Sequence, residues 1–144
     1  MFCNCYRVYE EMPQDLRARL QARLALNVYD YQRNMVQKTQ AVSPDAPRFA
    51  HPAVRVHPET HRKALFVNRL MTDHIVDMDA DESTSLLNRV FDFAEQPQFV
   101  YEHVWRVGDF LMWDNRCTMH ARSHFDPGHR RMMRRVAICG DRPF

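Results

Sequence analysis

The spacing of apolar residues predicts a helix near the amino end of the chain. Leu16, Leu20 and Leu24 recur every four residues, which places them on one face of a helix over residues 13–27. The periodicity then disappears over residues 30–49, which are mostly polar and contain two prolines. Loops of this length in a compact domain are usually lids, binding loops or disordered segments, so we expect either a lid or disorder here.

Short alternations of apolar and polar residues predict strands in the following part of the chain. Residues 53–57 and 63–68 are joined by a segment typical of turns, which indicates a β-hairpin. Further strands are expected over residues 99–106 and 109–114, on either side of a turn, and over residues 132–139.

A second helix is expected between these groups of strands. It opens at Asp81-Glu-Ser-Thr and ends before Pro97. Its apolar stripe consists of Leu86, Leu87, Val90, Phe91 and Ala94. Two helices and about five strands joined by hairpins predict a mostly β fold with antiparallel sheets and flanking helices. So few strands do not obviously close a sheet.

Length and composition are those of one folded domain. The chain has 144 residues, 45% of them hydrophobic and 26% charged, so we expect a single domain over residues 1–144 rather than a disordered chain. No apolar run is long enough to span a membrane, and the first residues lack the pattern of a secretory signal, which favours a cytoplasmic protein. The four cysteines include no C-x-x-C pair, so reduced thiols are expected rather than a cysteine metal site.

Charge is nearly balanced overall but unevenly distributed. The net charge is +2, yet residues 71–102 carry eight acids and one arginine, whereas residues 116–142 carry seven arginines and two acids. The basic part is suited either to small anions or to contact with the acidic part. Nucleic acid is a poor candidate partner, because these arginines alternate with apolar residues along a predicted strand.

The chemistry of the chain is concentrated between His120 and Arg135. A turn separates His120 from Arg131, and the alternation of the returning strand places Arg131 and Arg135 on the same face. Arg130 and Arg134 then point the other way and are expected to pair with acids of the acidic stretch. One imidazole and two guanidinium groups form a pocket suited to a metal and a dicarboxylate.

The motifs around these residues resemble those of a known family. The run W-D-N-R-x-x-x-H over residues 113–120, followed by R-x-x-x-R and G-D-R-P-F, is similar to the C-terminal half of the TauD/TfdA family. Members of that family are taurine and 2,4-dichlorophenoxyacetate dioxygenases that use non-haem Fe(II) and 2-oxoglutarate. The likeness continues upstream through HPAVRVHPETHRKALFVN, the ES-x-x-LL helix and QPQFVYEHVWRVGD, and so covers essentially the whole chain.

This resemblance implies a fold, a reaction and a set of site residues. The fold would be a partial double-stranded β-helix (jelly roll) that lacks its N-terminal strands. The reaction would be O₂-dependent hydroxylation of a small anionic organic substrate, coupled to decarboxylation of 2-oxoglutarate to succinate. His120 would bind the iron, Arg131 the 2-oxoglutarate and Arg135 the anionic group of the substrate, with Trp113 and Asn115 lining the site.

The sequence departs from the family pattern at the iron site. The family's other ligands form an H-x-D motif, followed by G-G-D-T, whose Thr helps bind 2-oxoglutarate; this chain aligns immediately after that segment. Its own H-x-D, His124-Phe-Asp126, is more typical of a turn. We therefore expect a truncated form with an incomplete iron site, inactive alone, whose exposed strand edges favour a homo-oligomer. The alternative is a non-catalytic, degenerate dioxygenase half that acts as a binding or interaction protein.

Three further histidines surround the first predicted hairpin. His51, His57 and His61 lie beside prolines or in the turn. We expect them to face solvent rather than to form a second metal site.

Overall fold

The computed structural model describes residues 1–30, 43–123, 126, 128–130 and 132–140. In chain order its elements are β1 (Phe2–Asn4), α1 (Cys5–Glu11), α2 (Gln14–Leu20), β2 (Leu24–Val28), β3 (Arg48–Pro52), β4 (Val54–Val56), β5 (Lys63–Leu65), β6 (Thr72–Ile75), α3 (Ala80–Ala94), the 3₁₀-helix η1 (Pro97–Phe99), β7 (Val100–Tyr101) and β8 (Thr118–His120). None of the helices in the described ranges has both the length and the apolar character needed to cross a membrane.

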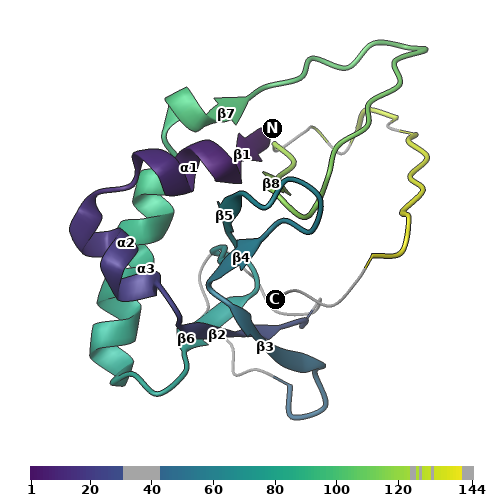
Figure 1. Ribbon diagram of the computed structural model, residues 1–144. Coiled ribbons are helices and arrows are strands. Elements are labelled where there is room, and N and C mark those ends of the chain that lie inside the picture. Colours follow the sequence, from purple (N-terminus) through teal and green to yellow (C-terminus); the bar gives the residue numbers. More distant parts are fainter. Residues whose placement is uncertain (31–42, 124–125, 127, 131, 141–144) are drawn as a thin grey trace.

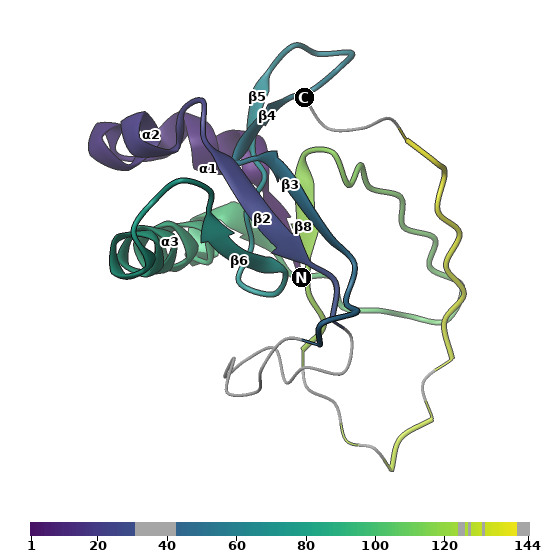
Figure 2. The same cartoon turned by 90° about the horizontal axis from the view of Figure 1, so that it is seen from below.

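The strands form three small antiparallel sheets, as the hairpin-rich pattern predicted. The strand orders are β7-β1-β8, β3-β2-β6 and β4-β5. Helices α1, α2 and α3 gather on one side of these sheets (Figures 1 and 2). On the other side, residues 102–113 and 132–140 extend away from the helices (Figures 1 and 2). Flanking helices on antiparallel sheets were expected from the sequence.

Helix α3 is the helix predicted around residues 81–94. The carboxylate of Asp79 caps its amino end by accepting hydrogen bonds from the N–H groups of Asp81 (2.9 Å) and Glu82 (3.2 Å). All five residues of its predicted apolar stripe are buried. The stripe packs in one core with residues of α1, α2 and the strands, among them Val8, Leu20, Leu65 and Ile75. A local 3.6-residue period was therefore enough to identify this helix.

The predicted hairpin of residues 53–57 and 63–68 is also present. Strand β4 pairs with β5, so that Val54 lies opposite Leu65 and Val56 opposite Lys63. Strand β5 ends at Leu65, three residues earlier than expected.

The predicted helix over residues 13–27 is wrong beyond Leu20. Helix α2 ends there, and Ala22 takes a left-handed conformation (φ 58°) that an α-helix cannot contain. The chain then enters β2, which pairs with β3 on one edge and with β6 on the other. The two neighbouring strands, which come from elsewhere in the sequence, outweigh the local helical pattern.

Most of the strands predicted near the carboxyl end are not formed. Only β7 forms within residues 99–106, and the described residues of 109–114 and 132–139 contain no strand. Their apolar side chains lie open to water: Phe110 is 88% exposed and Val136 is 92% exposed. A strand needs a hydrogen-bonded neighbour, and in the described part of the chain these segments have none.

The predicted loop of residues 30–49 is shorter than expected at its end. Strand β3 begins at Arg48, and residues 31–42 lie outside the described residues. Whether this segment is a lid or disordered stays a prediction.

The acidic stretch pairs with arginines other than those predicted. Arg19 contacts Glu82 (2.7 Å), and Arg69 contacts Asp92 and Glu95 (2.9 Å each). Arg130 and Arg134 are both exposed, and neither forms an ion pair with a described residue. The expected match between the acidic and basic parts of the chain is therefore not seen among them.

Candidate functional site

His120, the predicted metal ligand, is the last residue of β8 and lies opposite Phe2 of β1. Its ring centroid is 5.1 Å from that of Trp113 and 6.3 Å from that of Phe2. His120 is exposed, but desolvation of its ring by the neighbouring groups lowers its pKa, and the positive charges of Arg135 and the terminal amino group lower it further. A neutral imidazole is the form that binds a metal. The surroundings of His120 thus favour the form that a ligand role requires.

Of the two predicted anion-binding arginines, Arg135 belongs to the described part of the chain. Arg135 is exposed, and its positive charge acts on His120 by lowering the pKa of the imidazole. Arg131 lies outside the described residues. An arginine beside a neutral histidine gives this edge of β8 a positive potential suited to an anion.

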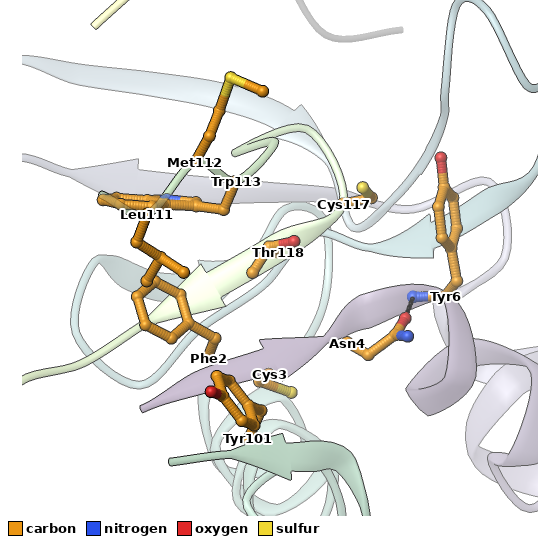
Figure 3. Close-up of a pocket in the computed structure, with 10 residues that line it drawn as sticks. All are labelled: Phe2, Cys3, Asn4, Tyr6, Tyr101, Leu111, Met112, Trp113, Cys117 and Thr118. Atoms are coloured by element: carbon orange, nitrogen blue, oxygen red, sulfur yellow. Dashed lines mark hydrogen bonds between the residues drawn. The ribbon is translucent and has the colours of Figure 1, made fainter. Parts of the chain in front are cut away.

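A cavity of about 360 Å³ lies beside His120, separated from it by Phe2 and Trp113. Its walls are mainly aromatic and aliphatic: Phe2, Cys3, Asn4, Tyr6, Tyr101, Leu111, Met112, Trp113, Cys117 and Thr118. Figure 3 shows Phe2, Leu111 and Trp113 together at one end of the cavity, with Tyr6 and Cys117 at the other. Such walls are typical of a site for the apolar part of a small molecule.

Trp113 and Asn115, predicted to line the site, are found together. Trp113 lines the cavity, and its indole Nε1–H donates to Asn115 Oδ1 (2.8 Å). Asn115 is exposed and does not line this cavity itself. It instead holds the indole from outside, which fixes the plane of the ring.

His57 corrects the prediction that the histidines of the hairpin face solvent. It is 3% exposed, and its Nε2 lies 3.1 Å from Asp114 Oδ2. Its Nδ1 accepts the backbone N–H groups of Glu59 and Thr60, both at 3.2 Å. Because Nδ1 must carry a lone pair to accept them, the proton of the neutral ring sits on Nε2 and is donated to Asp114. His57 therefore links the β4–β5 hairpin to the turn that precedes β8.

Asp114 is the centre of this link. Arg116 donates to its carboxylate from Nε (2.9 Å to each oxygen), from a terminal nitrogen (2.6 Å) and from its backbone N–H (2.8 Å). Arg116, helped by the hydrogen bond from His57, holds the pKa of Asp114 well below its usual range. The Asp114 carbonyl also accepts the N–H of Cys117 (3.3 Å). The turn that leads into β8 is thus fixed by a charged pair and an imidazole.

The same residues form the one group of three potential metal-ligating side chains among the described residues. Ligand atoms of His57, Asp114 and Cys117 lie within 4.8 Å of one another. Both ring nitrogens of His57 are already used, and Arg116 occupies the carboxylate of Asp114. A metal ion would have to displace a cation and change the tautomer of His57, so we interpret this group as a structural network. Nothing in the sequence around His57 indicates its partner, which is 57 residues away.

The H-x-D sequence near the end of the chain has a local structural role in the part that is described. The carboxylate of Asp126 accepts the N–H of Gly128 (2.8 Å), and its carbonyl accepts the N–H of His129 (3.0 Å). This is the turn chemistry expected from the sequence, and His124 lies outside the described residues.

Comparisons with known proteins agree with the motifs. The model of the family "Taurine catabolism dioxygenase TauD, TfdA family" matches residues 1–137. The alpha-ketoglutarate-dependent 2,4-dichlorophenoxyacetate dioxygenase of Burkholderia sp. (strain RASC) is 33% identical over 98% of this chain and 48% of its own length. Pentalenolactone F synthase of Streptomyces arenae is 32% identical over 99% of this chain and 52% of its own length.

Two solved structures are also similar to most of this chain. The crystal structure of AAD-2 in complex with Mn(II) and N-oxalylglycine has a TM-score of 0.82 and 29% identity, over 92% of this chain and 54% of that one. A putative alpha-ketoglutarate-dependent 2,4-D dioxygenase from Burkholderia xenovorans has a TM-score of 0.71 and 31% identity, over 81% of this chain and 46% of that one.

The matches cover nearly all of this chain but only part of each relative. The chain spans about half the length of the relatives it matches. The family model, in contrast, covers nearly all of this chain, and the W-D-N-R-x-x-x-H and R-x-x-x-R motifs lie inside the match, whereas G-D-R-P-F follows it. The chain therefore belongs to the TauD/TfdA family of taurine catabolism dioxygenases.

Proposed function

We propose that this chain contributes one part of the active site of a 2-oxoglutarate-dependent dioxygenase. The reaction would be hydroxylation of a small anionic organic substrate by O₂, with decarboxylation of 2-oxoglutarate to succinate. Membership of the TauD/TfdA family and relatives named as alpha-ketoglutarate (2-oxoglutarate)-dependent dioxygenases support this reaction. We also propose that the sheets belong to an incomplete double-stranded β-helix.

The observation that carries the proposal is the environment of His120. A histidine with a lowered pKa stands at the end of β8, beside the charge of Arg135 and next to a cavity with apolar walls. Metal ligand, anion anchor and apolar wall are the three elements that binding of an organic acid to a metal centre needs.

We assign three roles from the positions of these residues in the TauD/TfdA motifs, with the surroundings of His120 as structural support. His120 would be one ligand of Fe(II), Arg131 would bind the distal carboxylate of 2-oxoglutarate, and Arg135 would bind the anionic group of the substrate. A guanidinium group suits both the carboxylate and the anionic group of the substrate, because its planar fork can donate two parallel hydrogen bonds. Trp113 would form part of the apolar wall for the substrate, with Asn115 holding its indole.

The described residues do not by themselves form a complete iron site. His120 is not part of any group of three potential ligands there, and the nearby positive charge of Arg135 opposes a cation. A single imidazole holds Fe(II) weakly, because the carboxylate and the second imidazole of the family's triad provide much of the binding. We infer that the isolated chain binds iron poorly and is inactive, and that the remaining ligands come from an H-x-D motif outside it.

An anaerobic titration with Fe(II) in the presence of 2-oxoglutarate tests this proposal. The visible charge-transfer band of the chelated complex is measured for the 144-residue chain. It is also measured for the same chain extended at its amino end by the N-terminal part of the Burkholderia 2,4-dichlorophenoxyacetate dioxygenase. We expect no saturable band from the chain alone and a saturable band from the extended chain.

Two variants of the extended chain make the test specific to His120. His120→Ala should abolish the band, whereas His61→Ala, which removes an exposed histidine of the hairpin, should leave it unchanged. A band that survives His120→Ala would overturn the ligand assignment, and a band from the chain alone would overturn the inferred incompleteness. No band from either protein would favour the second candidate function, a non-catalytic binding protein, which the lack of a complete ligand set among the described residues supports.

A further inference from the structure

Arg55 is a buried cation that the proposed reaction does not use. It lies in the middle of β4 and is 4% exposed. Its guanidinium group stacks on the ring of Phe66, with 4.8 Å between its Cζ and the ring centroid. The ring covers the face of the guanidinium group, but the N–H groups at its edge still require hydrogen-bond acceptors.

No acceptor for these N–H groups is found in the described part of the chain. The Nε of Arg55 is enclosed without a hydrogen-bond partner, and Arg55 forms no ion pair with any described residue. Its two terminal nitrogens are not enclosed in this way. A buried charge without a partner is strongly unfavourable, so this arrangement calls for an anion.

The other stacked arginines in the described part of the chain show what the N–H groups at the edge of such a side chain bind. All four have an oxygen acceptor: Arg69 over Phe91 binds Asp92 and Glu95, Arg62 over Tyr6 binds Glu10, Arg7 over Phe99 binds Glu11, and Arg17 over Tyr9 binds the Glu10 carbonyl. In three of the four the acceptor is a carboxylate. Arg55 is the most buried of the five and has none.

The carboxylate of Asp114 cannot fill this role. Asp114 attracts Arg55 electrostatically, but both its oxygens are bound by Arg116 and one also by His57. Burial lowers the pKa of the Arg55 guanidinium group, and repulsion by the charge of Arg116 lowers it further. The partly exposed carboxylate of Asp114 thus acts on two guanidinium groups but is bound by that of Arg116 alone, and the local excess of positive charge lies at Arg55.

We propose that the terminal NH₂ groups of Arg55 form a carboxylate-binding site, distinct from the one assigned to Arg131 and Arg135. The ligand is a carboxylate group, because two parallel acceptors match the fork of the guanidinium group and its face is already covered by Phe66. This group comes either from a free organic acid or from an acidic side chain of another polypeptide. The inference does not depend on iron binding and goes beyond the proposed reaction.

The test follows the Nε–Hε signal of Arg55 in the metal-free, ¹⁵N-labelled 144-residue chain. Arg55→Lys removes this signal and so assigns it. The chain is titrated with acetate, which is equivalent to an acidic side chain, and with succinate, while sodium chloride keeps the ionic strength constant. We expect the Arg55 signal to shift saturably and the Arg69 signal, whose edge already binds two carboxylates, to stay in place.

Two further measurements show where the acid binds. The backbone amide of Phe66 reports binding in proteins without the Arg55 signal, and Arg55→Lys should weaken the affinity there by about tenfold, because lysine keeps the charge but loses the fork. Arg135→Gln should leave the Arg55 shift unchanged. A shift that disappears with Arg135→Gln would place the acid at the proposed substrate anchor and overturn the proposal.

The two acids distinguish the two sources of the carboxylate. Succinate binding about tenfold more tightly than acetate would identify a free dicarboxylic acid as the ligand, because only its second carboxylate can add affinity. Equal, weak binding of both would identify an acidic side chain. If neither acid shifts the Arg55 signal, or if chloride shifts it equally, the proposal is wrong whatever the outcome of the iron titration.

Discussion

The hydrogen bond between His57 and Asp114 should stabilise the fold measurably, and two substitutions of His57 can separate its functions. His57→Asn keeps an acceptor near Nδ1 for the N–H groups of Glu59 and Thr60 but cannot reach Asp114. His57→Gln does the reverse, because its amide group can extend to Asp114 but not turn back to the local backbone. A merely space-filling role of His57 would not distinguish the two variants.

The size of the effect follows from the burial of the two partners. A hydrogen bond to a charged group contributes about 1.5–3 kcal/mol. The side chain of Asp114 is 35% exposed and keeps Arg116 as a partner, so we expect the lower end of that range, about 1.5 kcal/mol. His57 is 3% exposed, and loss of its ring contacts should bring the total cost of His57→Asn to about 2.5 kcal/mol.

A double-mutant cycle isolates the contribution of the pair. The free energy of unfolding in urea is measured for the parent chain, His57→Asn, Asp114→Asn and the double variant. We expect a coupling free energy of about 1.5 kcal/mol, and no change beyond about 0.5 kcal/mol for His61→Asn, an exposed histidine of the same hairpin. Additivity of the two single substitutions to within about 0.3 kcal/mol would refute the assigned link.

Two further predictions concern the hydrogen bond of Ser83 and the ion pair of Asp114. Ser83→Ala should lower the free energy of unfolding by about 2 kcal/mol, because the buried Ser83 Oγ accepts the N–H of Ile75 (2.8 Å). Ser85→Ala, on the exposed face of α3, is the control in the same urea experiment. An equal effect of both substitutions would contradict the assigned hydrogen bond. Arg116 lowers the pKa of Asp114 in the folded state, so the ionised Asp114 stabilises the fold. This stabilisation is complete above the ordinary carboxylate pKa of about 4 and is lost as the pH falls through and below that value. The free energy of unfolding of the parent chain should fall between about pH 5 and pH 2. In Asp114→Asn this fall should be smaller by about 1 kcal/mol, a value that allows for solvent screening. Parallel pH profiles of the two proteins would contradict this.

Features that depend on neighbouring residues in the chain were predictable. The stripe of α3 and the alternation of β4 and β5 appear in the sequence with the period of their own backbone, and both elements form where expected. The motif that contains Trp113 and His120 was also readable, because its residues lie within one short segment.

Features that depend on contacts between distant segments were not predictable. Residues 24–28 continue a helical pattern, yet they form β2 because strands from two other parts of the sequence pair with both of its edges. Residues 132–139 alternate like a strand but have no neighbour among the described residues, and therefore do not form one. The partner of His57 could not be predicted for the same reason, since Asp114 is 57 residues away, in the turn before β8.

The sequence by itself therefore determined the family, the amphipathic helix, the first hairpin and the candidate residues His120, Arg131 and Arg135, because each is encoded by a local period or a contiguous motif. Only the tertiary structure decided that the charge of Arg135 acts on His120, that His57 is buried against Asp114, and that Arg55 is enclosed without an acceptor in the described residues. Burial and electrostatic pairing are properties of the space that distant segments enclose together, and no short stretch of sequence contains that information.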